Sequence, residues 1–150
     1  MVVVNWNRKQ LLRACLTSLA RQKNVDFETI VVDNGSSDGS AEMAESEFDA
    51  RVIRNRENRG FCAANNQGIA AARGEFVALL NNDAEAEPDW LAELERACGS
   101  RPQVGMAASK VLVWEDPSRI DKAGHLMFPD GQNRGRGSGM RPRHCLLGWR

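Results

Sequence analysis

The sequence predicts an α/β protein with a mostly parallel, doubly wound sheet. Short apolar runs rich in valine and isoleucine alternate with longer segments whose apolar residues recur every three or four positions. The connections are short, and this alternation is typical of parallel strands joined by helices. Right-handed crossovers then place helices on both faces of the sheet, in a Rossmann-like arrangement. The chain has 150 residues, which is enough for one buried core.

The first strand and the first helix follow from simple patterns. Met1–Val4 is an apolar run too short for a helix, and its valines are typical of a strand buried on both faces. After it, apolar residues three and four positions apart predict an amphipathic helix with charged residues on its other side. These apolar residues are Leu11, Leu12, Cys15, Leu16 and Leu19. Asn7 precedes them as a candidate N-cap.

Two further strands and helices follow in the same order. Thr29–Val32 predicts the second strand, and the polar, turn-rich string Asp33–Ser40 leads from it into a short helix through residues 43–44. Arg51–Ile53 predicts a third strand. The apolar spacing over residues 61–72 then predicts another helix, which completes the third strand and helix pair.

The last predicted elements precede a change in composition. Phe76–Leu80 predicts a fourth strand, which ends in Asn81–Asp83, and Pro88 with the acidic residues around it opens another helix. Val104–Trp114 predicts one more strand. From Gly131 onward glycine, arginine and proline dominate, and we expect an irregular tail there.

Composition excludes several classes of protein. Twenty basic residues balance twenty acidic ones, so no overall field attracts nucleic acid or an anionic membrane. No apolar stretch approaches the ~18 residues of a membrane span, and the start has no signal-peptide pattern. We therefore expect a cytoplasmic protein, free or peripheral at the inner membrane face. The cysteines lack metal-site or disulfide spacing, and three of the four fall on apolar helix faces, which predicts small buried hydrophobes. The four cysteines of the chain are Cys15, Cys62, Cys98 and Cys145.

Three loops are candidates for a binding site. In an open parallel sheet, ligands bind beyond the carboxyl ends of the strands, because helix N-termini and loop amides converge there. This rule selects Asn5–Asn7 after the first strand, Asp33–Ser40 after the second and Asn81–Asp83 after the fourth.

The carboxylates of these loops are the informative residues, because a carboxylate at the end of a buried strand is costly unless something binds it. Asp33 suits the N–H donors of a nucleobase edge, and Asp83 suits a hard divalent cation, with the carbonyl oxygen of Asn81 as a second ligand. The alternative is structural: Asp33 and Asp38 cap the following helix, and the last loop is an ordinary turn. Two such loops at one sheet edge favour the binding interpretation.

Five consecutive blocks read VVVNWN, VVDNGSSDGS, NRENRGFCAANNQGI, ARGEFVALLNNDAEAEPDWL and VGMAASKVL. In this order they resemble family 2 glycosyltransferases, particularly bacterial rhamnosyltransferase-like members. The ordered set is more specific than any single motif in the chain. The resemblance implies that residues 1–125 form the nucleotide-sugar-binding portion of a GT-A fold. Residues 126–150, the irregular tail rich in glycine and arginine, would then begin an acceptor half that is missing, so that the fold is truncated.

The resemblance also implies a chemistry and residue roles. It implies a nucleotide-diphospho-sugar donor, a divalent metal (Mn²⁺ or Mg²⁺), and inverting transfer of a sugar such as rhamnose to a saccharide or lipid-linked acceptor in polysaccharide biosynthesis. The residues implied for the nucleotide sugar are Asn5, Asn7, Asp33, Asn58, Gly60, Asn81 and Asn82. Asn81–Asp83 occupies the family's Asp-x-Asp position, and since Asn81 replaces the first aspartate, Asp83 is the implied metal ligand.

No catalytic base is assigned. Inverting transfer needs one, worth about 10²- to 10⁴-fold in rate, and in the family it lies downstream of the donor domain. No acidic residue follows Asp130, and the start at Met1 and the unfamiliar ending suggest a gene fragment.

Three hypotheses therefore stand: an enzyme, a non-catalytic nucleotide-binding remnant, and an interaction domain without a ligand. A missing acceptor half also predicts self-association through an exposed apolar face.

Overall fold

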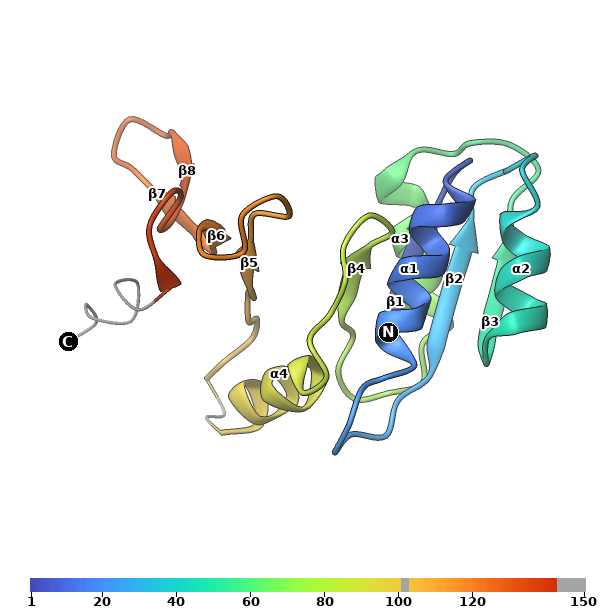
Figure 1. The fold of residues 1–150 in the computed structure, drawn as a ribbon, viewed down its shortest axis with the longest axis horizontal. Coiled ribbons are helices and arrows are strands. Elements are labelled where there is room, and N and C mark those ends of the chain that lie inside the picture. Colours follow the sequence, from blue (N-terminus) through green and yellow to red (C-terminus); the bar gives the residue numbers. More distant parts are fainter. Residues whose placement is uncertain (101–102, 143–150) are drawn as a thin grey trace. The chain divides into compact units, whose positions relative to one another are not determined.

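The computed structural model describes residues 1–100 and 103–142. They form two compact units, Met1–Arg96 and a second unit that begins at Ala97. The first unit is built on a four-stranded sheet in the order β3-β2-β1-β4 (Figure 1). β1 (Val2–Asn5) pairs in parallel with β2 (Thr29–Asp33) and with β4 (Leu79–Asn81), and β3 (Ala50–Arg54) pairs in parallel with β2. This confirms the predicted fold class.

Helices cover both faces of this sheet (Figure 1). α1 (Lys9–Leu19) and α2 (Ser40–Glu47) pack on one face, and α3 (Phe61–Ala71) packs on the other. The valines of β1 divide between the two cores: Val3 belongs to the cluster with the apolar side chains of α1 and α2, whereas Val2 packs in the cluster with α3. Because successive side chains of a strand point to opposite faces of the sheet, β1 contributes side chains to the core on each face, as a doubly wound sheet requires.

Two glycines permit close approaches that a side chain would prevent. Gly68 lies where α3 contacts the sheet, and a Cβ there would stand 2.3 Å from Val2 Cγ1. Gly35, at φ +81°, lies against the backbone of Glu57, and a Cβ there would stand 2.9 Å from its carbonyl carbon. The first glycine sets the depth of α3 on the sheet, and the second lets the loops after β2 and β3 pack against each other.

Several predicted boundaries were wrong. α1 begins at Lys9 with Arg8 as its N-cap residue, so Asn7 does not cap the helix. Asn7 instead has a left-handed φ of +48°, and its side-chain oxygen accepts a hydrogen bond from the backbone N–H of Ser37. β4 spans three residues rather than the whole predicted run, because its register begins with Leu79 opposite Val2, the first residue of β1.

The second unit contains short antiparallel pairs. α4 (Trp90–Gly99) crosses the division between the units. β5 (Lys110–Leu112) lies within the predicted last strand and pairs with β6 (Ile120–Ala123), and β7 (His125–Met127) pairs with β8 (Asn133–Gly135). The β7–β8 pair falls in the segment for which an irregular tail is predicted, so part of that segment is regular. The division into residues 1–125 and 126–150 follows the motif blocks and stays a prediction.

The cysteines differ in burial. Cys15 is buried on α1, as predicted, and Cys98 has intermediate exposure. Cys62 is exposed, so the prediction that it is a buried hydrophobe was wrong. Cys62 lies in the first turn of α3, whose buried residues are Ala64, Asn65 and Gly68 on the side facing the sheet. Cys145 lies outside the described residues.

None of the helices in residues 1–100 and 103–142 has the length and apolar character needed to cross a bilayer.

Candidate functional site

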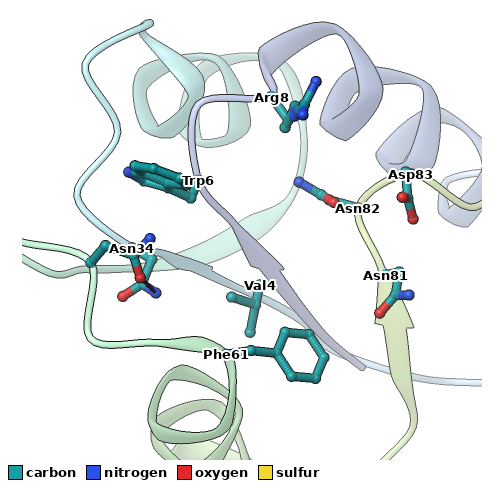
Figure 2. A pocket seen from close by; sticks show the side chains of 9 residues that line it. Val4, Trp6, Arg8, Asn34, Phe61, Asn81, Asn82 and Asp83 are labelled. Atoms are coloured by element: carbon teal, nitrogen blue, oxygen red, sulfur yellow. Dashed lines mark hydrogen bonds between the residues drawn. The ribbon is translucent and has the colours of Figure 1, made fainter.

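A pocket of about 300 Å³ opens at the carboxyl edge of the sheet, at the topological switch point. The chain runs from β1 to β2 and β3 on one side and then returns to β4 on the other, so the strand order reverses between β1 and β4. The pocket is lined by Val4, Trp6, Arg8, Asn34, Asn58, Phe61, Asn81, Asn82 and Asp83. Figure 2 shows Trp6 and Asn34 on one side, and Asn81, Asn82 and Asp83 on the other.

Asn5, at the end of β1, joins the three loops around this pocket. Its side chain is 1% exposed. Its Nδ2 donates to Ser36 Oγ at 3.3 Å and to Asp33 Oδ1 at 3.5 Å, in the loop after β2. Its Oδ1 accepts a hydrogen bond from Asn82 Nδ2 at 2.7 Å, in the loop after β4. Asn5 therefore holds the two sides of the pocket together and does not line the pocket itself.

Asp33 points into the protein. It is 3% exposed, its Oδ2 accepts a hydrogen bond from the backbone N–H of Ser36 at 2.9 Å, and Asn5 donates to its other oxygen. This bond from a backbone N–H three residues further along shapes the loop after β2. Asp33 does not line the pocket, whereas the next residue, Asn34, does.

Asp38 accepts hydrogen bonds at the start of the following helix, as the structural interpretation of its loop predicts, and it also does so at the start of α1. It accepts hydrogen bonds from the backbone N–H and hydroxyl of Ser40, at the start of α2, and its Oδ2 accepts one from the backbone N–H of Lys9, at the start of α1. Burial alone would raise the pKa of Asp38, but the hydrogen bonds from Ser40 and Lys9 outweigh it and hold that pKa below its usual value.

Asn34 connects the loops after β2 and β3. It is 2% exposed, and its Oδ1 accepts hydrogen bonds from Arg59 N and Asn55 Nδ2, each at 3.0 Å. Its Nδ2 donates to Asn58 Oδ1 at 2.8 Å, and Gly60 N donates to the same oxygen at 2.9 Å. Because a backbone N–H can only donate, these bonds fix both amide orientations, and the Asn58 Nδ2 group is turned away from the network.

The walls of the pocket combine aromatic and polar side chains. Trp6 is 52% exposed and Phe61 is 61% exposed, so both rings are open to a ligand in the pocket. Asn81 and Asp83 are both exposed at the end of β4. Trp6 therefore offers a stacking surface on one side of the pocket, and Asn81 and Asp83 offer hard oxygen atoms on the other (Figure 2).

Cys15 lies behind the loop after β4. Its thiol donates to the backbone oxygen of Asn81 at 3.6 Å. Burial, together with the negative charges of Asp83 and Glu85, raises the pKa of Cys15 to about 12. The thiol thus supports the loop as a neutral group.

The predicted site residues separate into two sets. Asn58, Asn81, Asn82 and Asp83 line the pocket. Asn5, Asn7, Asp33 and Gly60 lie in the loops around it and hold them through hydrogen bonds. The structure thus brings the predicted residues to one edge of the sheet.

Arg8, Asn34 and Phe61 also line the pocket, although none of them was predicted as a site residue. Arg8 had the pattern of a solvated helix face, and Phe61 that of a helix core residue. Asn34 directly follows Asp33, and this adjacency was the available signal. Trp6 lies inside the selected loop Asn5–Asn7 but had no predicted role, and the available signal was an aromatic side chain among asparagines at a strand end.

No group of three or more His, Cys, Asp or Glu side chains in residues 1–100 and 103–142 is arranged to hold a metal ion. Asp83 is the one carboxylate among the residues that line the pocket. A cation bound there would take most of its ligands from a phosphate-bearing ligand and from water, as Mg²⁺ commonly does.

The sequence matches a known family over most of its length. The model of Glycosyl transferase family 2 matches residues 1–136. The putative glycosyltransferase EpsH of Bacillus subtilis (strain 168) is 38% identical over 102 residues, which cover 66% of the chain and 30% of EpsH. The succinoglycan biosynthesis protein ExoO of Rhizobium meliloti (strain 1021) is 34% identical over 108 residues, covering 70% of the chain and 31% of ExoO. The chain thus spans under a third of the length of either relative.

Solved structures share the fold. The crystal structure of S. aureus TarS 1–349 in complex with UDP has a TM-score of 0.57 and 25% identity, covering 65% of this chain and 32% of that one. The mannosyltransferase PcManGT from Pyrobaculum calidifontis, in complex with GDP-Man and Mn²⁺, has a TM-score of 0.60 and 22% identity, covering 77% of this chain and 35% of that one. The second likeness is one of fold alone.

Proposed function

The chain belongs to glycosyl transferase family 2, and we propose that its pocket binds the nucleotide diphosphate of a sugar donor. The observation that carries this proposal is the pocket at the switch point of the sheet. Trp6 lies on one side of the pocket, and the carboxylate of Asp83 lies on the other (Figure 2). A nucleotide diphosphate has a base that stacks and a diphosphate that binds a hard cation, which matches the two walls.

The nucleoside lies against Trp6 in this proposal. Stacking of a base on an aromatic side chain contributes about 1–3 kcal/mol, and half of the Trp6 side chain is free to receive it. Asn58 presents its amide N–H₂ group, which suits an acceptor atom of a base or ribose. Asn5, Asn7, Asp33 and Gly60 contribute by fixing the loops that carry these side chains.

The diphosphate lies at the end of β4 in this proposal, where Asp83, Asn81 and Asn82 line the pocket. Asp83 is exposed, and no hydrogen bond or ion pair within the described residues engages its carboxylate, which fits a role as ligand of Mn²⁺ or Mg²⁺. The amide oxygen of Asn81 is a second hard ligand. The bound metal would supply several kcal/mol of stabilisation to the charge that develops on the leaving diphosphate.

The reaction we propose for the complete protein is inverting transfer of a sugar, such as rhamnose, to a saccharide or lipid-linked acceptor. Relatives named for O-antigen biosynthesis in Myxococcus xanthus and for succinoglycan biosynthesis in Rhizobium meliloti support a place in polysaccharide assembly. A second candidate is a nucleotide-binding remnant without turnover, because Asp83 is the one carboxylate among the residues that line the pocket and the proposal assigns it to the metal.

Calorimetric titration tests the proposal. UDP, GDP and dTDP are titrated into the chain with and without Mn²⁺, and we expect at least one of them to bind, more tightly with the metal. Absence of binding for all three would overturn the proposal. Donor hydrolysis and sugar transfer assays with the corresponding nucleotide sugars then separate the enzyme from the remnant, because the remnant binds its donor without converting it.

A further inference from the structure

Arg8 lines the pocket, and its side chain does not stabilise α1, the helix that begins after it. It lies at the same end of the pocket as Asn82 and Asp83 (Figure 2). Arg8 is also the N-cap residue of α1, where it makes no side-chain capping bond and where the first turn contains no acidic residue. A cation at the positive end of a helix dipole is locally unfavourable.

The backbone on both sides of Arg8 is held in place. Asn7 donates its backbone N–H to Ser36 Oγ at 3.0 Å and accepts a hydrogen bond from Ser37 N at 2.8 Å. Lys9 donates its backbone N–H to Asp38 Oδ2 at 2.9 Å. The loop after β2 therefore fixes the residue before Arg8 and the residue after it. These contacts hold the backbone of Arg8, and with it the Cβ atom of its side chain, in a defined position.

The guanidinium of Arg8 is exposed and has no acidic partner among the ion pairs of the described part of the chain. Some arginines of the first unit are engaged: Arg54 binds Glu42 and Glu45, and Arg73 binds Glu28. Arg56 and Arg59, like Arg8, are in none of these ion pairs, but of the three Arg8 alone lines the pocket. Arg8 is thus a cation with five N–H donors available at the mouth of the pocket.

We infer that Arg8 is a second cationic contact for the diphosphate of the bound nucleotide, beside the cation held by Asp83. This inference rests on the proposed function. A guanidinium matches phosphate oxygens with paired, charge-assisted hydrogen bonds, which a lysine ammonium cannot reproduce in the same geometry. The metal held by Asp83, in the loop after β4, and the guanidinium of Arg8, at the start of α1, then both contact the diphosphate. The contacts to the nucleoside involve neither residue.

The test compares Arg8→Gln and Arg8→Lys with the wild-type chain. The ligands are the nucleoside diphosphate that binds best among UDP, GDP and dTDP, its nucleoside, and inorganic pyrophosphate, each with Mn²⁺. We expect Arg8→Gln to weaken binding of the nucleoside diphosphate and of pyrophosphate by about ten- to a hundredfold, as loss of a charge-assisted hydrogen bond does. Binding of the nucleoside should change by less than about twofold, and Arg8→Lys should recover part of the loss.

Arg21→Gln is the matched control. Arg21 follows the opposite end of α1, makes only a 3.8 Å ion pair with Glu85, and its replacement changes the net charge by the same amount. We expect it to bind all three ligands as the wild type does, and an equal loss in both variants would overturn the inference in favour of a general charge effect.

Two other results decide between the proposals. If the wild type binds a nucleoside diphosphate and Arg8→Gln binds it and pyrophosphate equally well, Arg8 is a solvated side chain and this inference fails while the proposed function stands. If the wild type binds no nucleoside diphosphate, both fail. Matching circular dichroism spectra and melting temperatures establish that Arg8→Gln is folded.

Discussion

Replacement of Gly68 by alanine tests how α3 is seated on the sheet. The new Cβ would stand 2.3 Å from Val2 Cγ1, 3.1 Å from Val2 Cγ2 and 3.2 Å from Val32 Cγ2. Overpacking of this kind costs about 1–3 kcal/mol, and the short contact to Val2 places it near the upper end. Alanine is a better helix former than glycine by about 1 kcal/mol. We therefore expect Gly68→Ala to lower the free energy of unfolding by about 2 kcal/mol.

A double-mutant cycle with Val2→Ala isolates this contact. Val2→Ala removes both Cγ atoms that the new methyl group meets, so that in this background Gly68→Ala should be neutral or stabilising by about 1 kcal/mol. Urea unfolding followed by circular dichroism gives the four free energies. An equal cost of Gly68→Ala in both backgrounds would refute the reasoning, because the penalty would then not come from contact with β1.

Three further predictions concern the loops around the pocket. Because burial and nearby carboxylates raise the pKa of Cys15 to about 12, we expect a thiol reagent near pH 8 to label exposed Cys62 and to spare Cys15, as peptide mass spectrometry would show; equal labelling would contradict this. Asp38→Ala should lower stability by about 1 kcal/mol near neutral pH, because it removes the acceptor for the Lys9 N–H. Since the pKa of Asp38 is lowered in the fold, that contribution is present above the usual aspartate pKa and is lost as pH falls through the lowered pKa, so the difference between the variant and the wild type in urea unfolding should shrink as the solution is acidified. Asn34→Ala should cost about 2 kcal/mol, because it leaves buried partners without hydrogen bonds; a change in the urea midpoint worth less than about 0.5 kcal/mol would count against the network.

Much of the fold could be predicted from the sequence, because the elements of the first unit follow local patterns. The valine run of β1 and the spacing of Leu12 and Leu16 each specify one element and its buried side. The length of β4 could not be predicted, because it depends on which residue of β1 stands opposite Leu79. The β7–β8 pair was missed because neither strand has an alternating apolar pattern, and all six of its residues are exposed.

The edge that carries the site could be predicted, whereas the direction of individual side chains could not. The positions of Asp33 and Asp83 after strand ends predicted both as site residues, yet Asp33 turns inward and accepts a hydrogen bond from Ser36 N, whereas Asp83 lines the pocket. That difference depends on Asn5, a partner 28 positions away from Asp33. The link between Asn34 and Asn58 spans 24 positions, so a local pattern does not contain it.

The most direct test of the central claim is the effect of Mn²⁺ on nucleotide diphosphate binding by Asp83→Asn. We expect Mn²⁺ to tighten binding by about tenfold or more in the wild type and to have little effect in Asp83→Asn, because the amide loses the charge that holds the metal. Asp49→Asn, an exposed site before β3 at the opposite edge of the sheet, is the matched control and should keep the full effect. If Asp83→Asn responds to Mn²⁺ as strongly as the wild type does, the metal does not bind at the end of β4 and the account is contradicted.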